Sequence, residues 1–390
     1  MNKITIGLFI DTYYPMIDGV ISVVDNYAKN LMKYANVIVF APLIDNNYND
    51  DILPYKIIRC KSISNPLMDY KLPIPKFDKS FLNELENSNL DIVHVHSPFL
   101  IGKEGLKYAK KHNIPCIATM HTQYKKDVYK IVKNKLLTNL ITKSIVNTFE
   151  KFDECWAVNN EVARIFHEEY NYSKIPRVMN NATEMTYIED RNESKKYLYN
   201  KYNIKDNELI FLFVGRINLL KNIIFIVDSI NLLKDKKPDL KFKMLFVGTG
   251  QDESILKKHI KELELDNYII LCGKVSNRTE LAYYYKEAFL FLFPSTFDAS
   301  SIVQIEAASQ KTPGLFIKGS CTASSITNNV NGYLSNNNIE DYTNKIIEII
   351  DNKSLYKKVC NNCYKDIYIN WNRCIKEVYD LYIKKINETK

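Results

Sequence analysis

The sequence predicts an α/β protein made of two doubly wound, parallel-sheet domains. Three observations lead to this prediction. Short, almost wholly apolar runs alternate with amphipathic helical patterns, and the alternation begins again after a polar stretch near the middle of the chain. The chain also has 390 residues, which is more than one hydrophobic core usually holds.

The first half of the chain alternates strand and helix. We expect helices at Ile21–Lys33 and around Lys103–His112, and an irregular stretch from Asp45 to Lys79. The expected strands are Ile4–Ile10, Val37–Ala41, Asp91–His96, Cys116–Met120 and Cys155–Val158. Ligands of such sheets bind beyond the carboxyl ends of the strands. The polar residues in that position are Asp11–Gly19, His94–Ser97 and His121–Tyr124.

The second half repeats this pattern after the polar stretch Asn180–Asn207, which we interpret as a linker and a first helix. The expected strands are Leu209–Val214, Phe242–Val247, Tyr268–Leu271, Leu290–Phe293 and Gly314–Ile317. A last helix, from about Tyr364 to Ile386, has no third core to join. We therefore expect domains at residues 1–185 and 186–365, facing each other across a central cleft, and a C-terminal helix at 366–390 that crosses back to the first domain.

Composition limits the classes of function. The net charge of +8 favours anionic partners such as phosphates or acidic lipid surfaces. The eight cysteines are scattered, which suits free thiols in a reducing cytosol, and the pair Cys360 and Cys363 lacks a second pair at zinc spacing. A structural role is favoured over a metal site for that pair. Neither a signal peptide nor a membrane-spanning run is recognisable, so we expect a cytoplasmic protein.

Two acids flank a transition from strand to helix in the segment Phe293–Gln310, FPSTFDASSIVQIEAASQ. Asp298 lies in the expected loop and Glu306 lies in the expected helix. A helix N-terminus offers N–H groups to an anion, and the acids can hold hydroxyl groups. In the alternative, Asp298 caps the helix and Glu306 is a solvated helix residue. This segment alone supports both equally.

Two cations and two glycines follow earlier strands of the second domain. Arg216 and Lys221 come after Leu209–Val214, where a guanidinium fork and an ammonium suit a diphosphate; solvated basic residues are the alternative. Gly248 and Gly250 come after Phe242–Val247 and would allow a ligand close to the backbone, although a plain turn explains them as well.

Taken in order, these motifs resemble the retaining glycosyltransferases of the GT4 group, which have the GT-B fold. The second-domain motifs are Gly215-Arg216-x4-Lys221, Val247-Gly248-x-Gly250 and Asp298-x7-Glu306-Ala307. Similar first-domain segments are Asp11-x3-Pro15-x3-Gly19-Val20, Asp91-Ile-Val-His94-Val-His96 and His121-Thr-Gln-Tyr124. The resemblance covers nearly the whole chain.

The resemblance implies a role for each matching residue. Arg216 and Lys221 would neutralise the diphosphate that leaves a nucleotide sugar. Asp298 would bind the donor sugar, Glu306 the ribose, and His121 would face the sugar from the other domain. The other implied contacts are Gly19 to the phosphate, the backbone N–H groups of Ser301, Ile302 and Val303 to sugar and phosphate, and Gly273–Val275 to the base.

The sequence departs from the family pattern at several positions. Asp298 stands where the family usually has Glu, and Ser301 where it usually has Gly. The usual Gly-x-Pro after the second acid and the Asn-Gly of the linker are also replaced, here by Gln310-Lys311-Thr312-Pro313 and Asn181-Ala182. The charged groups survive, so the chain resembles a divergent branch whose donor-sugar selectivity is open.

The function that the resemblance implies is transfer of a hexose with retention. The donor would be a UDP-sugar, with a GDP-sugar as the alternative, and the acceptor a hydroxyl of a glycan or lipid-linked molecule in cell-envelope or surface polysaccharide synthesis. The chain lacks Asp-x-Asp, so we expect no metal and no cofactor, and we expect no nucleic-acid partner. The alternatives are a sugar-nucleotide epimerase of the same fold, which needs no acceptor, and a catalytically degenerate nucleotide-binding subunit.

One further segment, Tyr124–Lys151, has the pattern of a single basic amphipathic helix. Its apolar residues at helical spacing are Val128, Ile131, Val132, Leu136, Leu140, Ile141, Ile145 and Phe149, and its lysines are Lys125, Lys126, Lys130, Lys133, Lys135, Lys143 and Lys151. For the apolar stripe we favour an ordinary core helix. For the charges we favour peripheral contact with an anionic membrane, at the inner face of the cell membrane.

Overall fold

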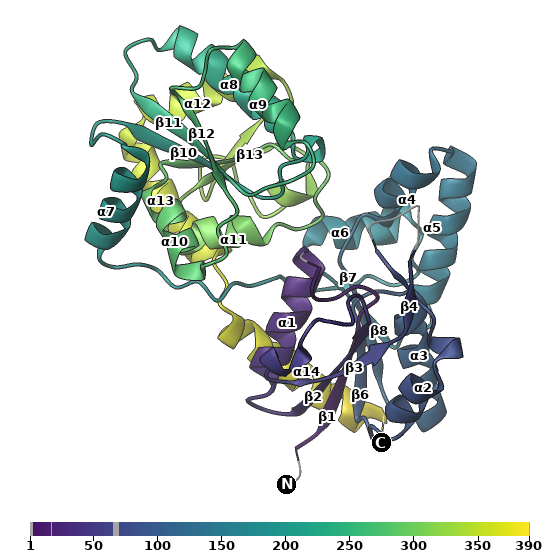
Figure 1. Cartoon of the computed structure of the whole chain (residues 1–390). Helices are drawn as coiled ribbons and strands as arrows, with labels where there is room; N and C mark the ends of the chain where they lie inside the picture. Colours follow the sequence, from purple (N-terminus) through teal and green to yellow (C-terminus); the bar gives the residue numbers. More distant parts are fainter. Residues whose placement is uncertain (1–2, 17, 65–69, 390) are drawn as a thin grey trace. The chain divides into compact units, whose positions relative to one another are not determined.

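The protein divides into two compact units, each with its own parallel β-sheet between layers of helices (Figure 1). The computed structural model describes residues 3–16, 18–64 and 70–389. Unit 1 comprises Met1–Asn181 and Trp371–Lys390, and unit 2 comprises Ala182–Asn370. The boundaries expected from the sequence lay after residues 185 and 365.

Unit 1 contains a parallel sheet in the order β3-β2-β1-β6-β7-β8-β9, and the short antiparallel pair β4-β5. Its described strands are β1 Thr5–Phe9, β2 Asn36–Pro42, β3 Lys56–Cys60, β4 Ser62–Ile63, β5 Leu72–Pro73, β6 Ile92–Val95, β7 Cys116–Met120, β8 Glu154–Ala157 and β9 Arg177–Val178. Its described α-helices are α1 Gly19–Leu31, α2 Lys79–Glu86, α3 Leu100–His112, α4 Tyr124–Val132, α5 Lys135–Phe149, α6 Asn160–Arg164 and α14 Trp371–Thr389.

The C-terminal helix α14 belongs to unit 1 because aromatic side chains hold it there. Tyr27 of α1 packs edge-on against Trp371, with ring centroids 5.6 Å apart, and Tyr382 stacks on Trp156 of β8 at 5.8 Å. Trp371, Trp156 and Tyr382 are almost fully buried. The last helix therefore completes the core of the first unit, although it follows the whole of the second unit in the sequence.

Unit 2 contains a parallel sheet in the order β12-β11-β10-β13-β14-β15. Its described strands are β10 Leu209–Val214, β11 Phe242–Val247, β12 Ile269–Gly273, β13 Leu290–Phe293, β14 Gly314–Ile317 and β15 Tyr333–Ser335. Its described α-helices are α7 Arg191–Tyr202, α8 Ile223–Lys236, α9 Glu253–Glu262, α10 Arg278–Glu287, α11 Ile302–Ser309, α12 Ile339–Asp351 and α13 Lys353–Ile367. Figure 1 shows α8, α9 and α12 on one face of the sheet and α7, α10 and α11 on the other.

Each sheet has a topological switch point, where the strand order reverses. In unit 1 the reversal lies between β1 and β6, and in unit 2 it lies between β10 and β13. Ligands of open α/β sheets bind beyond the carboxyl ends of the strands at such points. A ligand of unit 2 is therefore expected at the two loops that follow β10 and β13.

The structure corrects three expectations about elements. The stretch Asp45–Lys79 was expected to be irregular, but it contains the edge strand β3. Residues 65–69 of this stretch lie outside the described part of the chain, and so does residue 17 in the loop after β1. The final helix is two helices, α13 and α14. They are separated because the chain around Asn370 pairs with Thr183, whose N–H donates to the Ile369 carbonyl at 2.9 Å.

The segment Tyr124–Lys151 is also two helices, α4 and α5, and not one. Lys133 adopts a left-handed conformation, with φ of 50°, which ends α4. Asn134 then caps α5 by accepting a hydrogen bond from the Leu137 N–H at 3.1 Å. Helical spacing continues across this break, so the apolar pattern alone could not reveal it.

Candidate functional site

An ion pair connects the two loops at the switch point of unit 2. Lys221 ends the short helix η4, Leu219–Lys221, that follows β10, and its Nζ contacts the Asp298 carboxylate in the loop after β13. The second carboxylate oxygen of Asp298 accepts a hydrogen bond from the Ser295 hydroxyl. Both charged side chains are largely covered, with 20% and 17% of their surface exposed. The structure thus brings together two predicted site residues that are 77 positions apart.

The loops themselves are tied together beside this pair. Asn222 adopts the left-handed conformation, with φ of 55°, and its side-chain amide donates to the Pro294 carbonyl at 2.8 Å. The Lys221 ammonium also lies over the Phe293 ring, 5.6 Å from its centroid. Arg216 is an exposed residue of the same loop as Lys221. The Lys221 ammonium is therefore positioned by the end of β13 and by the loop that follows it.

Helix α11 begins where the sequence predicts an anion-binding N-terminus. Ser301 is its N-cap residue, and the Ser301 side chain makes no capping hydrogen bond. Ser301 is buried, whereas Ile302 and Val303 in the first turn are half-buried. Asp298 lies three residues before the cap and pairs with Lys221, so it is not the capping residue that the alternative interpretation required.

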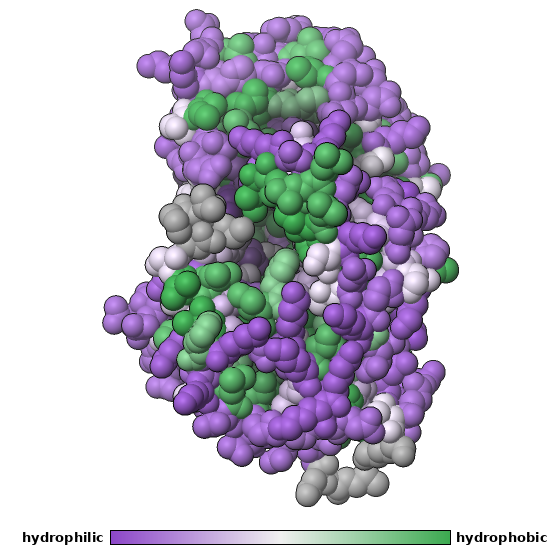
Figure 2. Space-filling view, turned by 90° about the vertical axis from the view of Figure 1, so that its right-hand side faces the viewer, coloured by the Kyte–Doolittle hydropathy of each residue, from purple (hydrophilic) through white to green (hydrophobic). Residues whose placement is uncertain are grey.

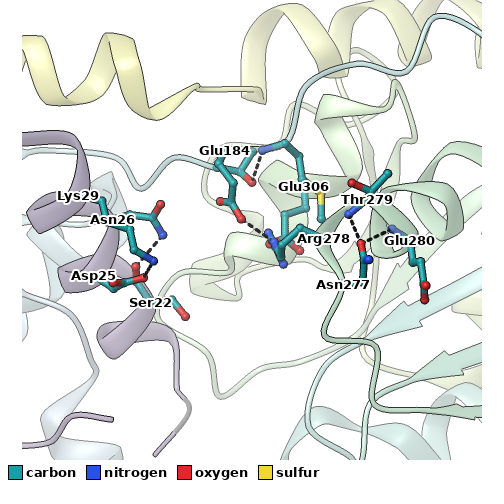
Figure 3. Close-up of polar contacts among 12 residues, drawn as sticks. Ser22, Asp25, Asn26, Lys29, Glu184, Asn277, Arg278, Thr279, Glu280 and Glu306 are labelled. Carbon is teal, nitrogen blue, oxygen red and sulfur yellow. Dashed lines mark hydrogen bonds and ion pairs between the residues drawn. The ribbon is translucent and has the colours of Figure 1, made fainter. Parts of the chain in front are cut away.

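Glu306 is a buried acid with two hydrogen-bond donors. Only 3% of its surface is exposed. One carboxylate oxygen accepts from the Arg278 guanidinium at 2.5 Å (Figure 3). The other accepts from the Tyr285 hydroxyl at 2.8 Å. The alternative interpretation of Glu306 as a solvated helix residue is therefore wrong.

Arg278 links two carboxylates, Glu306 and Glu184, a role that was not predicted from the sequence. Its Nε donates to Glu184 at 2.5 Å, as Figure 3 shows. Burial opposes the positive charge, but the two carboxylates outweigh it and raise the pKa of the Arg278 guanidinium. Asn277 caps α10 by accepting from the Thr279 and Glu280 N–H groups, which places Arg278 in the first turn. An Asn before a helical pattern was the one available sequence signal.

Gly248 and Gly250 are required by a close contact between two loops. Gly248 has φ of 138°, and a Cβ atom there would lie 1.9 Å from the Gly215 carbonyl oxygen. A Cβ atom on Gly250 would lie 2.1 Å from the Ile217 carbonyl oxygen. The same loops exchange a backbone hydrogen bond from Ile217 to Thr249 at 3.0 Å. The structure thus explains both glycines by backbone packing, and their predicted contact with a ligand stays a prediction.

The remaining predicted residues lie at other loop ends. In unit 2, Val275 is half-buried against the core, two residues after Gly273, whose φ is 71°. In unit 1, Gly19 is the first residue of α1, and a Cβ atom there would have open space around it. Gly19 thus leaves room in front of the helix N-terminus, which is what the predicted approach to a phosphate needs.

His121 of unit 1 is buried in a chain of histidines. Its Nε2 lies 2.9 Å from Nδ1 of His96, and the neighbouring His94 is held by Tyr382 of α14 and by Thr119 at 2.7 Å. Burial lowers the pKa of His121 to about 3, and the pKa values of His94 and His96 well below the usual range. His121 is therefore neutral at physiological pH, and can contribute hydrogen bonds but no positive charge.

Asp11, at the carboxyl end of β1, is engaged with the start of α3. Its carboxylate accepts from the N–H groups of Phe99 at 3.2 Å and Ile101 at 2.7 Å. Burial raises its pKa to about 6, although these hydrogen bonds oppose the shift. These hydrogen bonds to the start of α3 explain structurally why an acid lies at the switch point of unit 1.

No group of three or more His, Cys, Asp or Glu side chains in the described ranges is arranged to hold a metal ion. Cys360 and Cys363 are free thiols, and the Cys363 Sγ contacts the Cys360 carbonyl at 3.1 Å.

Within the same ranges, no helix is long and apolar enough to cross a membrane.

Two Rossmann-like parallel-sheet domains define the GT-B class of fold. Solved structures of the same fold align with nearly the whole chain. Sucrose-phosphate synthase from Thermosynechococcus elongatus aligns with a TM-score of 0.79 at 18% identity, over 98% of this chain and 99% of that one. Anabaena HepE, solved in complex with UDP and glucose, aligns with a TM-score of 0.74 at 13% identity, over 98% and 100%. At these identities the likeness establishes the fold.

Sequence comparison then gives the family. Residues 17–184 match the model of Glycosyltransferase Family 4, and residues 194–366 match that of Glycosyl transferases group 1. The two matches do not overlap and together cover most of the chain. The chain therefore belongs to the family 4, group 1 glycosyltransferases, as the motifs indicated.

Two relatives are alpha-monoglucosyldiacylglycerol synthases. The protein from Streptococcus pneumoniae is 29% identical over 79% of this chain and 70% of its own length. The protein from Acholeplasma laidlawii is 27% identical over 96% of this chain and 94% of its own length.

The contact at Gly248 generates a prediction about stability. Gly248→Ala should lower the free energy of unfolding by about 2–4 kcal/mol, because the methyl group meets a backbone oxygen and φ is positive. Gly19→Ala, where the space is open, should change it by less than about 0.5 kcal/mol. Urea denaturation followed by circular dichroism measures both. Equal transitions for Gly248→Ala and the wild type would show that the two loops are not in contact.

Proposed function

We propose that the protein transfers a hexose from a nucleotide sugar to a hydroxyl group, with retention of the anomeric configuration. UDP-sugars are the preferred donors and GDP-sugars the alternative. The observation that carries the proposal is the Lys221–Asp298 ion pair at the switch point of unit 2, followed within eight residues by the buried Glu306. Lys221 would supply a cation for a diphosphate, and Asp298 and Glu306 would supply two acids for hydroxyl groups, all at the same edge of the unit 2 sheet.

The Lys221–Asp298 pair suggests how a donor would be bound. A diphosphate carries more negative charge than one carboxylate, so it would compete with Asp298 for the Lys221 ammonium. The Asp298 carboxylate would then be available to accept a hydrogen bond from a hydroxyl of the donor sugar. Glu306, held by Arg278 and Tyr285, would accept from the ribose hydroxyls. Donor binding would thus replace the Lys221–Asp298 ion pair by one between Lys221 and the diphosphate, and Asp298 would exchange its ion pair for a hydrogen bond to the sugar.

The reaction itself depends on charge stabilisation. When the bond from the anomeric carbon to the diphosphate oxygen breaks, negative charge grows on the diphosphate, where Lys221 and Arg216 would stabilise it. The acceptor oxygen forms its new bond on the face that the diphosphate leaves, and the acceptor proton passes to a diphosphate oxygen. This route needs no covalent intermediate with the protein, and we propose that it needs no metal ion and no cofactor.

We propose a membrane lipid as the acceptor. The support is that both synthases described above are named for a product in which glucose is joined to diacylglycerol. The alpha linkage in those names is also what retention from an alpha-linked nucleotide glucose would give. A glycan or lipid-linked saccharide of the cell envelope is the second acceptor class. The reaction would take place in the cytoplasm, at the inner face of the membrane.

Product analysis tests the proposal directly. The full chain is incubated with a panel of UDP- and GDP-sugars and diacylglycerol in detergent micelles, with and without EDTA, and the products are identified by mass spectrometry. We expect a hexosyl lipid and the free nucleoside diphosphate, in equal yield with EDTA. An altered nucleotide sugar formed without acceptor would indicate an epimerase, and no turnover of any donor would indicate a degenerate subunit. Activity lost in EDTA and restored by Mg²⁺ would contradict metal independence.

The diphosphate assignment predicts the effect of removing either cation. Arg216→Ala and Lys221→Ala should each lower kcat by roughly 30- to 1,000-fold, or about 2–4 kcal/mol at the transition state, with the fold unchanged. Lys258→Ala, on α9 with 79% of the lysine side chain exposed, is a control that should retain wild-type rates. Near-wild-type rates for both site variants would show that the diphosphate binds elsewhere.

The assignment of Asp298 and Glu306 to the donor site predicts how substitutions of these two acids affect the kinetics. Asp298→Glu should be tolerated, because it retains the charge that pairs with Lys221, whereas Asp298→Asn should not. Glu306→Gln should raise the KM for the donor, because the amide has one acceptor oxygen and one NH2 donor, whereas the carboxylate accepts hydrogen bonds at two oxygens. Steady-state kinetics with the productive donor measure all three. Wild-type kcat and KM for both amide variants would remove Asp298 and Glu306 from the donor site.

A further inference from the structure

The hairpin of α4 and α5 in unit 1 is attached to the core along one side. On α5, Thr138, Thr142, Ile145, Val146 and Phe149 are buried. Tyr124, at the start of α4, packs against Phe149 and Phe166, with ring centroids 5.8 and 5.9 Å apart. The Thr122 hydroxyl also donates to Asp127 in the first turn of α4. The hairpin is therefore anchored at its base and along the second half of α5.

The tip of this hairpin exposes large apolar side chains to solvent. Five of the fifteen such residues in the described part of the chain lie between positions 129 and 140. Leu136 is 78% exposed and Leu140 66%, and the others are Tyr129, Ile131 and Leu137. The apolar stripe was expected to be an ordinary core face, and this is wrong for its middle part: only the residues near Ile145 and Phe149 are buried. Large exposed apolar clusters usually mark an interaction surface.

Lysines surround the exposed cluster. The segment from Tyr124 to Lys151 contains the seven lysines named above and only two acids, Asp127 and Glu150. Lys125, Lys133, Lys135 and Lys143 are exposed, and no ion pair to any of these four is found among the residues that the structure describes. Lys133 ends α4 and Lys135 begins α5, so both flank the turn next to Leu136 in the sequence. Figure 2, which faces the side where α4 and α5 lie in Figure 1, shows a compact green patch bordered by purple residues.

We propose that the α4–α5 tip, defined here as residues 129–140 with the lysines around it, inserts its apolar side chains into an anionic lipid bilayer. Leu136, Leu140 and Ile131 would enter the boundary between headgroups and acyl chains, and the lysines would contact the acidic headgroups. This combination is typical of helices that lie in a membrane interface, because lysine stems extend along the apolar surface while their ammonium groups stay in water.

Charge favours a bilayer over a second copy of the chain as the occupant. A symmetric dimer through this surface would bring the same lysine-rich border against itself. Like charges around a shared apolar patch repel one another, whereas an anionic membrane neutralises them. The inference deepens the proposed function, since it makes a bilayer lipid the natural acceptor class. Membrane binding is nevertheless measured without a donor, so its failure and the failure of the proposed transfer are separate results.

The test uses the full chain with vesicles of phosphatidylcholine alone or mixed with phosphatidylglycerol. Cosedimentation should require the anionic lipid and weaken as salt rises. Leu136→Ser with Leu140→Ser should lower the partition coefficient by about tenfold or more. Replacing Lys125, Lys133, Lys135 and Lys143 by Ser should also lower it and flatten its salt dependence. A Leu136→Trp variant should show a blue shift of its emission on anionic vesicles, which surface attraction without insertion would not produce.

Matched controls come from unit 2. Ile255→Ser with Val330→Ser removes two exposed apolar side chains, and Ser at Lys353, Lys357, Lys358 and Lys365 removes four exposed lysines. Both controls should bind vesicles within about twofold of the wild type, and all variants should melt as the wild type does. Three results would overturn the proposal: equal recovery in the supernatant with neutral and anionic vesicles, equal weakening by the controls, or a lipid-free dimer that Leu136→Ser with Leu140→Ser converts to monomer.

Discussion

The ion pair between Lys221 and Asp298 joins the loops that follow β10 and β13, and the arrangement of the unit 2 site depends on it. Burying two charges costs desolvation energy, which a single contact offsets only in part, so such a pair is a weak source of stability. Glu306 is paired in a similar way with Arg278. Both acids of one loop–helix segment are thus balanced by cations from other segments. We infer that this balance holds polar groups ready for a ligand that exchanges with them.

The core strands could be predicted from the sequence, and so could the edge strand β12, whereas the edge strands β3, β9 and β15 could not. Strands β10, β11, β13 and β14 begin and end at the predicted residues, because they are buried on both faces and read as continuous apolar runs. Edge strand β3 has exposed and half-buried polar residues such as Lys56 and Arg59, and β15 has three residues. Such short, partly solvated strands have no distinctive period. Their existence depends on a neighbour that is distant in sequence.

The sequence predicted which residues belong to the candidate site, but it did not predict which of their side chains pair with one another. Local patterns reveal that Arg216, Lys221 and Asp298 lie in loops after strands and that Glu306 lies in the helix after one of these loops. That Lys221 meets Asp298, or that Arg278 of α10 meets Glu306 of α11, depends on how the sheet and its helices pack, and no local pattern contains this information. The α4–α5 break was missed for the opposite reason: helical spacing continues through it, and only the capping residue Asn134 marks the new start.

The most direct test of this account is a structure of the protein with its productive nucleotide donor, or the corresponding nucleoside diphosphate, bound. We expect diphosphate oxygens at about 2.7–2.9 Å from the Lys221 ammonium and within hydrogen-bonding reach of the Arg216 guanidinium, with Asp298 released from Lys221 towards the sugar. A nucleotide bound with its diphosphate away from the switch point of β10 and β13, and with the Lys221–Asp298 pair intact, would contradict it.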